Sequence, residues 1–441
     1  MLKTFRIGGI HPPENKLSAN KKIENLPLPQ QVIIPLVQHL GAPAVPVVAK
    51  GDQVKVGTLI AKSGGVISAN IHSSVSGKVL KIDQVLDASG FKRPAIYINV
   101  EGDEWEESID RSDVLLKECD LSSKEIIGKI AYAGIVGLGG ATFPTHVKLT
   151  PPPGSKAEVL IVNASECEPY LTDDHSLMLA KGEEILVGIT ILMKALDVDK
   201  AYIGIENNKK DAINHLSDIA GRYSNISVVP LKVQYPQGGE KQLIDAIIGR
   251  QVPSGALPIS VGAVVQNVGT AFAVYEAVQK NKPMVERIVT VTGKNLPKQC
   301  DIWTRLGTPV SNLIEYVGGL PTDTGKVISG GPMMGRAITS TDVPVGKGVT
   351  AVLVMSSDES FRKEMRSCIR CTKCVMACPM GLVPSYLMNT VEFEEFGKAQ
   401  QFNILDCIEC GSCTYVCPSN RPLLDYVRLG KSIVQKNMRN R

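Results

Sequence analysis

Several features are scarce or missing in this sequence of 441 residues, and each absence excludes a class of protein. Aromatic residues make up only 5% and the formal net charge is only +4, so no base-stacking surface or basic nucleic-acid site is indicated. The N-terminus, MLKTFRIGGIHPPENK, lacks the apolar core of a signal peptide. We therefore expect a protein of the reducing cytoplasm, where cysteines serve metals more often than disulfides.

Long apolar runs are missing as well. The best candidate, ISVGAVVQNVGTAFAVYEAV from Ile259, contains Gln266, Asn267 and Glu276, and it falls short of the ~20 uninterrupted apolar residues that span a membrane. Any membrane association is therefore expected to depend on a partner. With 44% hydrophobic and 21% charged residues the composition is that of a globular protein, and the length predicts about three domains.

Cysteine is abundant near the C-terminus, where two runs hold eight of the eleven cysteines. CIRCTKCVMACP and CIECGSCTYVCP both follow C-x2-C-x2-C-x3-C-P, the two-cluster ferredoxin pattern in which the fourth cysteine of each run ligates the other cluster. One [4Fe-4S] cluster is predicted on Cys368, Cys371, Cys374 and Cys417. The second is predicted on Cys407, Cys410, Cys413 and Cys378. The alternatives are disulfides or structural zinc, but zinc sites usually use separated pairs of cysteines.

The surroundings of these runs suggest further expectations. Positive residues flank the first run and would raise its potential or steer an acidic redox partner, or else form ordinary surface charge: Arg366, Arg370 and Lys373. At least one helix is expected between the runs, and the basic tail from Gly430 is expected to be disordered or a docking arm. Cys119, Cys167 and Cys300 lack motif spacing and are expected to be buried thiols.

Residues 1–115 indicate a small β-rich domain. VPVVAKGDQVKVGTLIAKSGG and IHSSVSGKVLKID alternate apolar and polar residues between glycine turns, which predicts short antiparallel strands. The two stretches resemble the barrel-sandwich domain of biotinyl and lipoyl carriers. The modifiable lysine of those carriers is absent, so the resemblance implies a scaffold; an unrelated small β-domain is the alternative.

Residues 116–284 alternate strands and helices, which predicts a parallel α/β sheet with ligands at the carboxyl ends of its strands. Polar residues follow three of these strands: Asn163, Glu166 and Glu168; Glu206 and Asn207; and Tyr235 to Glu240. A glycine-rich loop, GIVGLGGATFPT from Gly134, precedes the first strand. Thr142 replaces the third glycine of a GxGxxG, so the dinucleotide pattern is poor, although main-chain N–H groups could still approach a phosphate or a flat ring.

The segments GLGGATFPTHVK, VNASECEPY, QYPQGGEKQL and VVQNVGTAF together resemble, in order, the flavin site of the NADH-binding flavoprotein subunit of respiratory complex I. This resemblance implies FMN held by seven residues: Gly137, Gly139, Gly140, Lys148, Asn163, Asn267 and Thr270. It implies an NADH side lined by Phe143, Glu166, Glu168, Tyr235 and Glu240. Four positions depart from the family pattern, and they bear on the nicotinamide side more than on FMN: Leu138, Thr142, Ser165 and Lys241.

The last two regions complete the predicted order of domains. Residues 285–350 read as strand, strand and helix and resemble the small β-grasp (SLBB-like) domain that follows the flavin domain in complex I. A structural spacer is the expected role, with a partner surface at Asp301–Trp303 and GGPMMG as the alternative. Residues 351–441 hold the two cysteine runs and the tail, which predicts a helical dicluster ferredoxin-like domain.

This whole order resembles the RnfC family, the C subunits of the Rnf ion-translocating ferredoxin:NAD oxidoreductases of bacterial membranes. The resemblance implies a multidomain α/β oxidoreductase subunit that exchanges hydride between NAD(H) and FMN and needs no catalytic acid or base. Single electrons would pass through two [4Fe-4S] clusters to or from a ferredoxin-like iron–sulfur subunit. The chain would lie at the cytoplasmic face of the membrane, attached through its partner subunits.

Two other hypotheses stay open on the sequence. A soluble cobalamin reductase of a propanediol-utilisation compartment has the same order of domains and would reduce a corrinoid. An electron-relay subunit that has lost its flavin is favoured by Leu138 and Lys241, which replace polar and acidic residues of the flavoprotein pattern.

Overall fold

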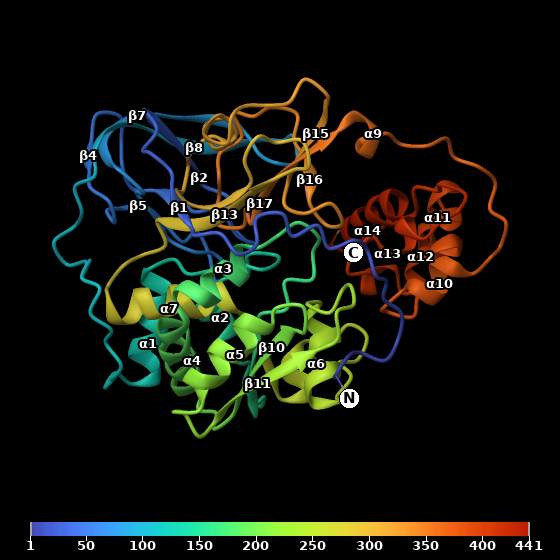
Figure 1. Ribbon diagram of the computed structural model, residues 1–441, viewed down its shortest axis with the longest axis horizontal. Coiled ribbons are helices and arrows are strands. Elements are labelled where there is room, and N and C mark those ends of the chain that lie inside the picture. The colour runs from blue at the N-terminus through green and yellow to red at the C-terminus, as the bar shows by residue number, and fades with distance from the viewer. Residues whose placement is uncertain (1, 440–441) are drawn as a thin grey trace.

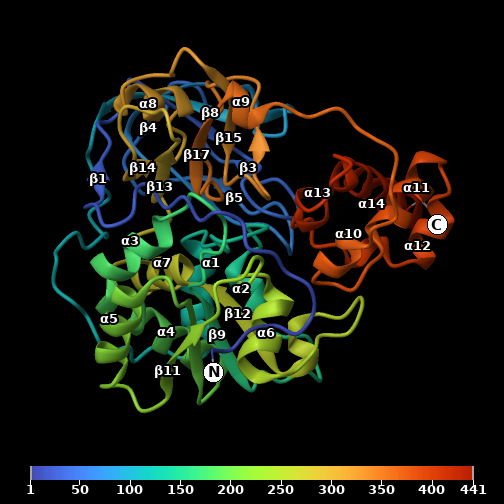
Figure 2. The same cartoon turned by 45° about the vertical axis from the view of Figure 1, so that its right-hand side comes forward.

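The computed structural model describes residues 2–439 (Figure 1). Two β-rich units form the upper part of the view in Figure 1, an α/β unit lies below them, and a helical C-terminal unit lies to one side. Figure 2 shows the same arrangement after rotation, with one long connection leading from the β-rich part to the helical unit. The prediction of a multidomain α/β protein is confirmed.

The N-terminal β-unit consists of two small antiparallel sheets, in the orders β2-β8-β7-β4 and β3-β5-β6. Its strands are β2 (Gln31–Pro35), β3 (Val45–Pro46), β4 (Gln53–Val54), β5 (Leu59–Lys62), β6 (Ile71–His72), β7 (Ser76–Leu86) and β8 (Lys92–Gly102). Branched side chains such as Ile34, Ile60 and Ile98 are fully buried between the sheets. In β2 and in the middle of β8, buried residues alternate with more exposed ones, so these strands bury one face against the core.

The α/β unit is built on a parallel sheet in the order β11-β10-β9-β12. Its strands are β9 (Val159–Asn163), β10 (Ala201–Glu206), β11 (Ile226–Leu231) and β12 (Ala263–Asn267). The helices are α1 (Ser123–Tyr132), α2 (Thr145–Lys148), α3 (Asp173–Ala180), α4 (Gly182–Leu196), α5 (Lys210–Ala220), α6 (Glu240–Ile248), the short η1 (Pro258–Val261) and α7 (Val268–Gln279). Parallel pairing brings the carboxyl ends of all four strands to one edge.

The β-grasp unit is a mixed sheet of six strands in the order β1-β14-β13-β17-β15-β16. It contains β13 (Glu286–Thr292), β14 (Cys300–Arg305), α8 (Val310–Tyr316), β15 (Thr324–Ser329), β16 (Arg336–Ala337) and β17 (Ala351–Ser356). The predicted order of strand, strand and helix is present. Two strands fall outside our division of the chain: β1 (Glu24–Asn25) joins one edge of the sheet from the N-terminal region, and β17, an inner strand between β13 and β15, follows residue 350.

The C-terminal unit is helical. It comprises α10 (Lys373–Ala377), α11 (Pro384–Glu392), α12 (Phe396–Gln401), η2 (Ile404–Asp406), α13 (Ser412–Tyr415) and α14 (Leu423–Arg439). The short α9 (Ser357–Ser360) precedes it and packs on β15 and β17 of the β-grasp unit. The helix expected between the cysteine runs is present as α11 and α12. The expectation of a disordered tail from Gly430 is wrong for the residues up to Arg439, because α14 continues through them; Asn440 and Arg441 lie outside the described residues.

The reason for this difference is a buried stripe on α14. Val427 and Val434 are each 2% exposed, and between them a Cβ on Gly430 would lie 2.2 Å from a Val391 methyl group. The basic residues that suggested a disordered arm lie on the same helix as this apolar stripe. Packing of the stripe against α11 therefore stabilises the helix despite its charge.

An N-terminal strap (residues 3–17) crosses from the α/β unit to the helical unit, as the dark blue trace of Figure 1 shows. Ile10 exchanges two main-chain hydrogen bonds with Tyr235, at 2.8 and 2.9 Å. The N–H of Gly9 donates to the carbonyl of Ala377 in α10, at 3.1 Å. The strap therefore connects the sheet edge to the cysteine-bearing helices.

Candidate functional site

The glycine-rich loop lies against the first turn of α7. The N–H of Leu138 donates to Thr270 Oγ1 at 3.0 Å, and a Cβ on Gly139 would lie 2.8 Å from Asn267 Nδ2. No atom lies within 4 Å of the Cβ position of Gly140, which is exposed. Gly139 thus permits close packing, while Gly140 leaves its outer side open to a ligand.

Two predicted asparagines occupy neighbouring positions at the ends of β9 and β12, since Asn163 and Asn267 are paired across the sheet. Asn267 Oδ1 accepts from the N–H groups of Gly269 and Thr270 and so caps α7, and its Nδ2 donates to Asp174 Oδ2 at 2.7 Å. Asn163 Nδ2 donates to the carbonyl of Gly238 at 2.8 Å. The structure therefore brings both amides and the glycine loop to one edge of the sheet.

Lys148 and Glu240, predicted for opposite sides of the site, form an ion pair of 2.6 Å with each other. Their side chains are 29% and 41% exposed, so both can be reached from solvent. Glu240 is the first residue of α6, where a carboxylate is favoured by the helix dipole. The carbonyl of Phe143, which is half-buried, accepts from the N–H of Gly137 at 2.9 Å and closes the loop.

The carboxylate of Glu166 is hydrogen-bonded to main-chain groups of the protein itself. Its side chain is 2% exposed, and Oε1 accepts from the N–H groups of Asp174 and His175 at the start of α3. Burial raises the pKa of this carboxyl to about 7, opposed by the nearby ammonium of Lys16. Glu166 thus caps a helix in this conformation.

Glu168 faces the β-grasp unit. Its Oε1 accepts from the N–H groups of Met333 and Met334, at 3.0 and 2.7 Å, while its Oε2 is buried without a hydrogen-bond partner among the described residues. Burial raises the pKa of Glu168 to about 7. The GGPMMG turn was considered above as a possible partner surface. It is instead hydrogen-bonded to Glu168, which was predicted to line the NADH side.

Two lysines, the half-buried Lys16 and the buried Lys209, support the segment of residues 165–171, and sequence reasoning missed both. Lys16 of the strap donates from Nζ to the carbonyls of Glu166, Glu168 and Leu171, at 2.8, 2.9 and 2.7 Å. Lys209 donates to the carbonyl of Ser165 at 2.8 Å. Main-chain carbonyls leave no side-chain signature, and Lys16 is some 150 positions away, so no motif could have identified it.

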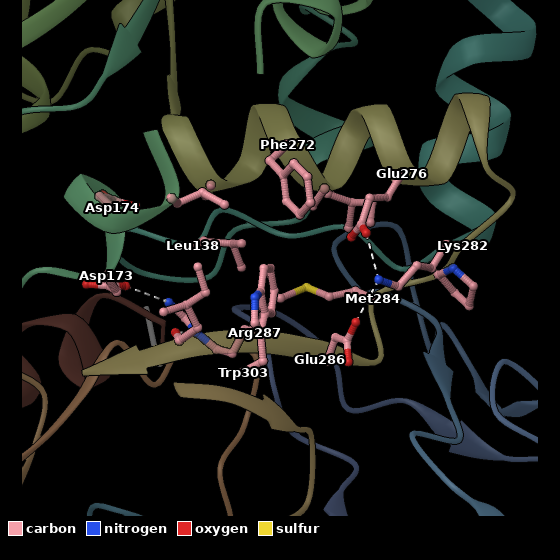
Figure 3. Close-up of a pocket in the computed structure, with 16 residues that line it drawn as sticks. Leu138, Asp173, Asp174, Phe272, Glu276, Lys282, Met284, Glu286, Arg287 and Trp303 are labelled. Carbon is pink, nitrogen blue, oxygen red and sulfur yellow. Dashed lines mark hydrogen bonds and ion pairs between the residues drawn. The ribbon is translucent and has the colours of Figure 1, made fainter. Parts of the chain in front are cut away.

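A pocket that is partly open to solvent lies beside the glycine loop between α7 and β13 (Figure 3). Its walls include Leu138 and the tilted ring pair of Phe272 and Trp303. Five of its charged groups are paired within the chain: Arg287 with Asp173 at 3.2 Å, and Lys282 with Glu276 and Glu286 at 2.6 and 2.7 Å. The sixth, Asp174, accepts from the Asn267 amide. None of the twelve predicted flavin and nucleotide residues lines it, so this pocket is a junction between the α/β and β-grasp units.

Four cysteines predicted to share a cluster line one pocket: Cys378, Cys407, Cys410 and Cys413. The other walls are largely apolar and include Leu387, Leu424 and Val427. Main-chain N–H groups of Glu409 and Leu382 donate to the sulfurs of Cys407 and Cys378, at 3.3 and 3.4 Å.

This donor set suits an iron–sulfur cluster, which takes soft thiolates and is tuned by hydrogen bonds to sulfur. Burial raises the pKa of Cys407 to about 11 and that of Cys413 to about 12, so these thiols keep their protons unless a cation replaces them. Across residues 2–439 no three His, Cys, Asp or Glu side chains are grouped to hold a metal ion. The four thiols therefore line a common pocket and do not converge on the position of a single ion.

The cysteines of the other predicted set are more open. Cys368 and Cys371 are exposed, and Cys374 and Cys417 are half-buried. α10, which carries Cys374, packs against α13, which ends two residues before Cys417. The chain thus brings the third member of this set near its fourth and leaves the first two thiols at the surface.

The sheet edge and the cysteine pocket are in direct contact through Tyr235. Its hydroxyl donates to the carbonyl of Cys410 at 2.8 Å, and its ring, 2% exposed, packs with Ile10, Ala377 and Cys410. Cys167 and Met333 lie at the margin of this cluster. The phenol therefore points to the cysteine loop, where the sequence predicted a nucleotide contact.

None of the helices formed by residues 2–439 combines the length and the apolar character needed to cross a membrane.

Four protein families match consecutive regions of the chain. They are the RnfC barrel sandwich hybrid domain (residues 3–103), the Nuo51 FMN-binding domain (130–276), the SLBB domain (288–337) and the 4Fe-4S dicluster domain (361–418). The domain types predicted from the sequence, including those for FMN and 4Fe-4S clusters, are confirmed by these matches.

Curated relatives match nearly the full length. The chain is 47% identical to the C subunit of the proton-translocating ferredoxin:NAD(+) oxidoreductase complex of Clostridium ljungdahlii, covering 98% of this chain and 94% of that protein. It is 43% identical to the Na(+)-translocating counterpart of Acetobacterium woodii, covering 97% and 96%. It is 40% identical to the C subunit of the ion-translocating oxidoreductase complex of Rhodobacter capsulatus, covering 98% and 83%.

Among solved structures, the chain resembles one from an NAD+-reducing [NiFe]-hydrogenase in the air-oxidized state. The TM-score is 0.51 at 16% identity, over 71% of this chain and 66% of that one. At this identity the similarity concerns the fold alone.

Proposed function

The chain belongs to the family of C subunits of ion-translocating ferredoxin:NAD(+) oxidoreductase complexes, and we propose that it exchanges hydride with NAD(H) and relays single electrons. The proposal includes one FMN in the α/β unit and two [4Fe-4S] clusters in the helical unit. Electrons pass to or from a ferredoxin-like iron–sulfur subunit. The chain sits at the cytoplasmic face of the membrane, held by the other subunits.

The α/β unit supplies the flavin cradle. FMN, when bound, accepts or donates a hydride and exchanges single electrons, which matches a nicotinamide to an iron–sulfur cluster. Gly137, Gly139 and Gly140 keep the loop surface free of side chains, and Thr270 fixes the loop through the N–H of Leu138. The half-buried amides Asn163 and Asn267 define the floor at the strand ends. Lys148 can exchange its carboxylate partner Glu240 for a phosphate.

Fewer residues are available to contact the nicotinamide than the resemblance implied. Phe143 and Glu240 are reachable from solvent, whereas Glu166, Glu168 and Tyr235 are engaged by α3, by the GGPMMG turn and by Cys410. We assign the first two to contacts with NAD(H). Glu166, Glu168 and Tyr235 instead hold the segment after β9, the β-grasp unit and the helical unit in place around that contact.

The observation that carries the proposal is the hydrogen bond from Tyr235 to Cys410. It joins the edge of an FMN-type sheet to the pocket of Cys378, Cys407, Cys410 and Cys413, so a flavin and a cluster would lie on the two sides of one contact. A chain that only carried electrons between partners would not need its cysteine pocket packed against the flavin fold.

The cobalamin-reductase hypothesis is not favoured, because relatives at 40–47% identity carry the name of the ion-translocating complex. The hypothesis of a flavin-free relay is weakened by the match of residues 130–276 to an FMN-binding family.

The test is a spectrum taken without oxygen. The protein would be reconstituted with iron and sulfide, supplied with FMN, freed of unbound flavin and mixed with NADH. Bleaching of the flavin band together with loss of the broad cluster absorption is expected. Retained FMN that NADH fails to bleach, or clusters that only dithionite reduces, would refute the hydride step or the internal relay respectively.

A further inference from the structure

The two cysteine runs differ sharply in exposure. The pocket of the second run is buried against the α/β unit, whereas every residue from 361 to 373 is exposed. This first-run segment (residues 361–376) includes the connection from α9 to α10, which runs along the outside of the molecule at the right of Figure 1. The thiols of Cys368 and Cys371 therefore lie at the outer surface.

Large apolar side chains are exposed along the same segment. Phe361 is 76% exposed, Met365 47%, Ile369 67% and Met376 73%. Single apolar residues on a surface need no explanation, but four within sixteen positions of one exposed segment that carries two exposed cysteines are apolar surface of the kind that partners cover. The apolar side chains of methionine and isoleucine are suited to the centre of such an interface.

The charge of the segment has one sign. It contains five basic residues and a single acid, Glu364. Arg362 is paired with Asp425 in α14, but Lys363, Arg366, Arg370 and Lys373 have no carboxylate partner among residues 2–439. An exposed apolar centre with unpaired positive charges complements a surface with an acidic rim.

We propose that the first-run segment is the docking face for an acidic iron–sulfur protein, and that electrons leave or enter the chain there. This rests on the proposed function, because it assigns the outer end of the relay to Cys368, Cys371, Cys374 and Cys417. One electron crosses the interface at a time: one cluster is oxidised, its counterpart in the partner is reduced, and no bond or proton changes place. The inner end is the pocket of Cys410.

The experiment compares two triple variants of the reconstituted full-length protein. The first variant, Arg366→Glu/Arg370→Glu/Lys373→Glu, reverses the charge of three basic side chains of the segment. Lys50→Glu/Lys62→Glu/Lys92→Glu reverses three exposed bases of the N-terminal β-unit and changes the net charge equally. The probe is a reduced acidic two-cluster bacterial ferredoxin, mixed rapidly with each oxidised protein at low salt. Binding of the oxidised ferredoxin is measured in parallel, without turnover.

The native rate should fall as salt is added, and the segment variant should lose about tenfold or more in rate and in affinity, since steering by charge is worth 10–10³-fold. The matched variant should keep both values. Ile369→Ser/Met376→Ser should weaken binding while keeping the salt dependence. Each variant should retain the iron content of the native protein.

Equal losses in the two triple variants would overturn the proposal, because net charge alone would explain them. It would also be overturned if ferredoxin binding were unchanged and only binding to phosphatidylglycerol vesicles were lost. NADH bleaching of flavin and clusters is recorded separately in every variant. If it is absent while ferredoxin binding still depends on the segment, the hydride step fails and the docking face stands.

Discussion

At the scale of residues, identical side chains have different roles because their surroundings differ. Cys413 lines a pocket with three other thiols, whereas Cys119 is a half-buried thiol outside any motif. We predict that Cys413→Ala removes one cluster, about four of about eight iron atoms per chain, while Cys119→Ala removes none. Iron analysis of reconstituted protein checks this. Full iron in the Cys413 variant would contradict the ligand set.

A second prediction concerns Glu168, whose pKa is raised by burial to about 7 from an ordinary 4.5. The folded state then binds more protons than the unfolded state between these values, so its contribution to stability is lost as pH rises from about 4.5 to 7. Glu168→Gln keeps an acceptor for Met333 and Met334 but cannot ionise. Relative to native protein it should gain on the order of 3 kcal/mol between pH 5 and pH 8.

Chemical denaturation of both proteins at several pH values measures this difference. A constant difference across pH 5–8 would show that Glu168 ionises freely in the folded protein.

Site residues were predictable from the sequence where the signal is local. The cysteine spacing, the glycine loop and the asparagines at strand ends are all short patterns, and the structure brings the glycines and asparagines to one edge. The support from Lys16 is not local, because an ammonium that binds three carbonyls leaves no pattern in the sequence. The orientation of Tyr235 toward Cys410 depends on how two distant units pack.

At the scale of elements, periodicity predicted the α/β unit well, because β9, β10 and β11 are continuous apolar runs between amphipathic helices. It failed for α14, where the basic residues hid the stripe of Val427 and Val434. It also missed the N-terminal strap, which has no repeating pattern and is held by main-chain hydrogen bonds to Tyr235 and Ala377. Such a segment is fixed by tertiary contacts alone.

The strap gives a third prediction. Gly8 has a φ of +72°, and a Cβ there would lie 2.5 Å from the carbonyl of Cys378. Gly51, with a φ of +99°, has nothing within 4 Å of its Cβ position. Alanine at either position costs roughly 1 kcal/mol in backbone strain, but only Gly8→Ala must also push the strap away from the cysteine pocket.

Gly8→Ala should therefore lower the Tm more than Gly51→Ala and release iron faster to a chelator. Thermal unfolding and chelation kinetics on the two variants provide the comparison. If both variants behave alike, the strap does not support the pocket.

At the scale of the whole molecule, the units are arranged in the order in which we propose that electrons pass through them. The FMN-type sheet edge meets the buried cysteine pocket at Tyr235, and the exposed cysteines of the first run lie beyond it at the surface. No domain by itself contains this order. It arises from packing among the strap, the GGPMMG turn and the helical unit, which is why domain matches along the sequence could name the parts but not their contacts.

Tyr235→Phe tests this arrangement at its narrowest point. The variant keeps the ring and its packing with Ile10, Ala377 and Cys410 but leaves the Cys410 carbonyl without its donor, at a cost of about 1 kcal/mol. In rapid mixing with NADH, bleaching of the flavin should keep its native rate while bleaching of the clusters slows, because a bonded link between the units becomes a contact. Tyr132→Phe, which alters an exposed tyrosine, should change neither rate. A slower flavin step in the Tyr235 variant would instead place its hydroxyl at the nicotinamide, and the contact with Cys410 would then serve only to hold the two units together.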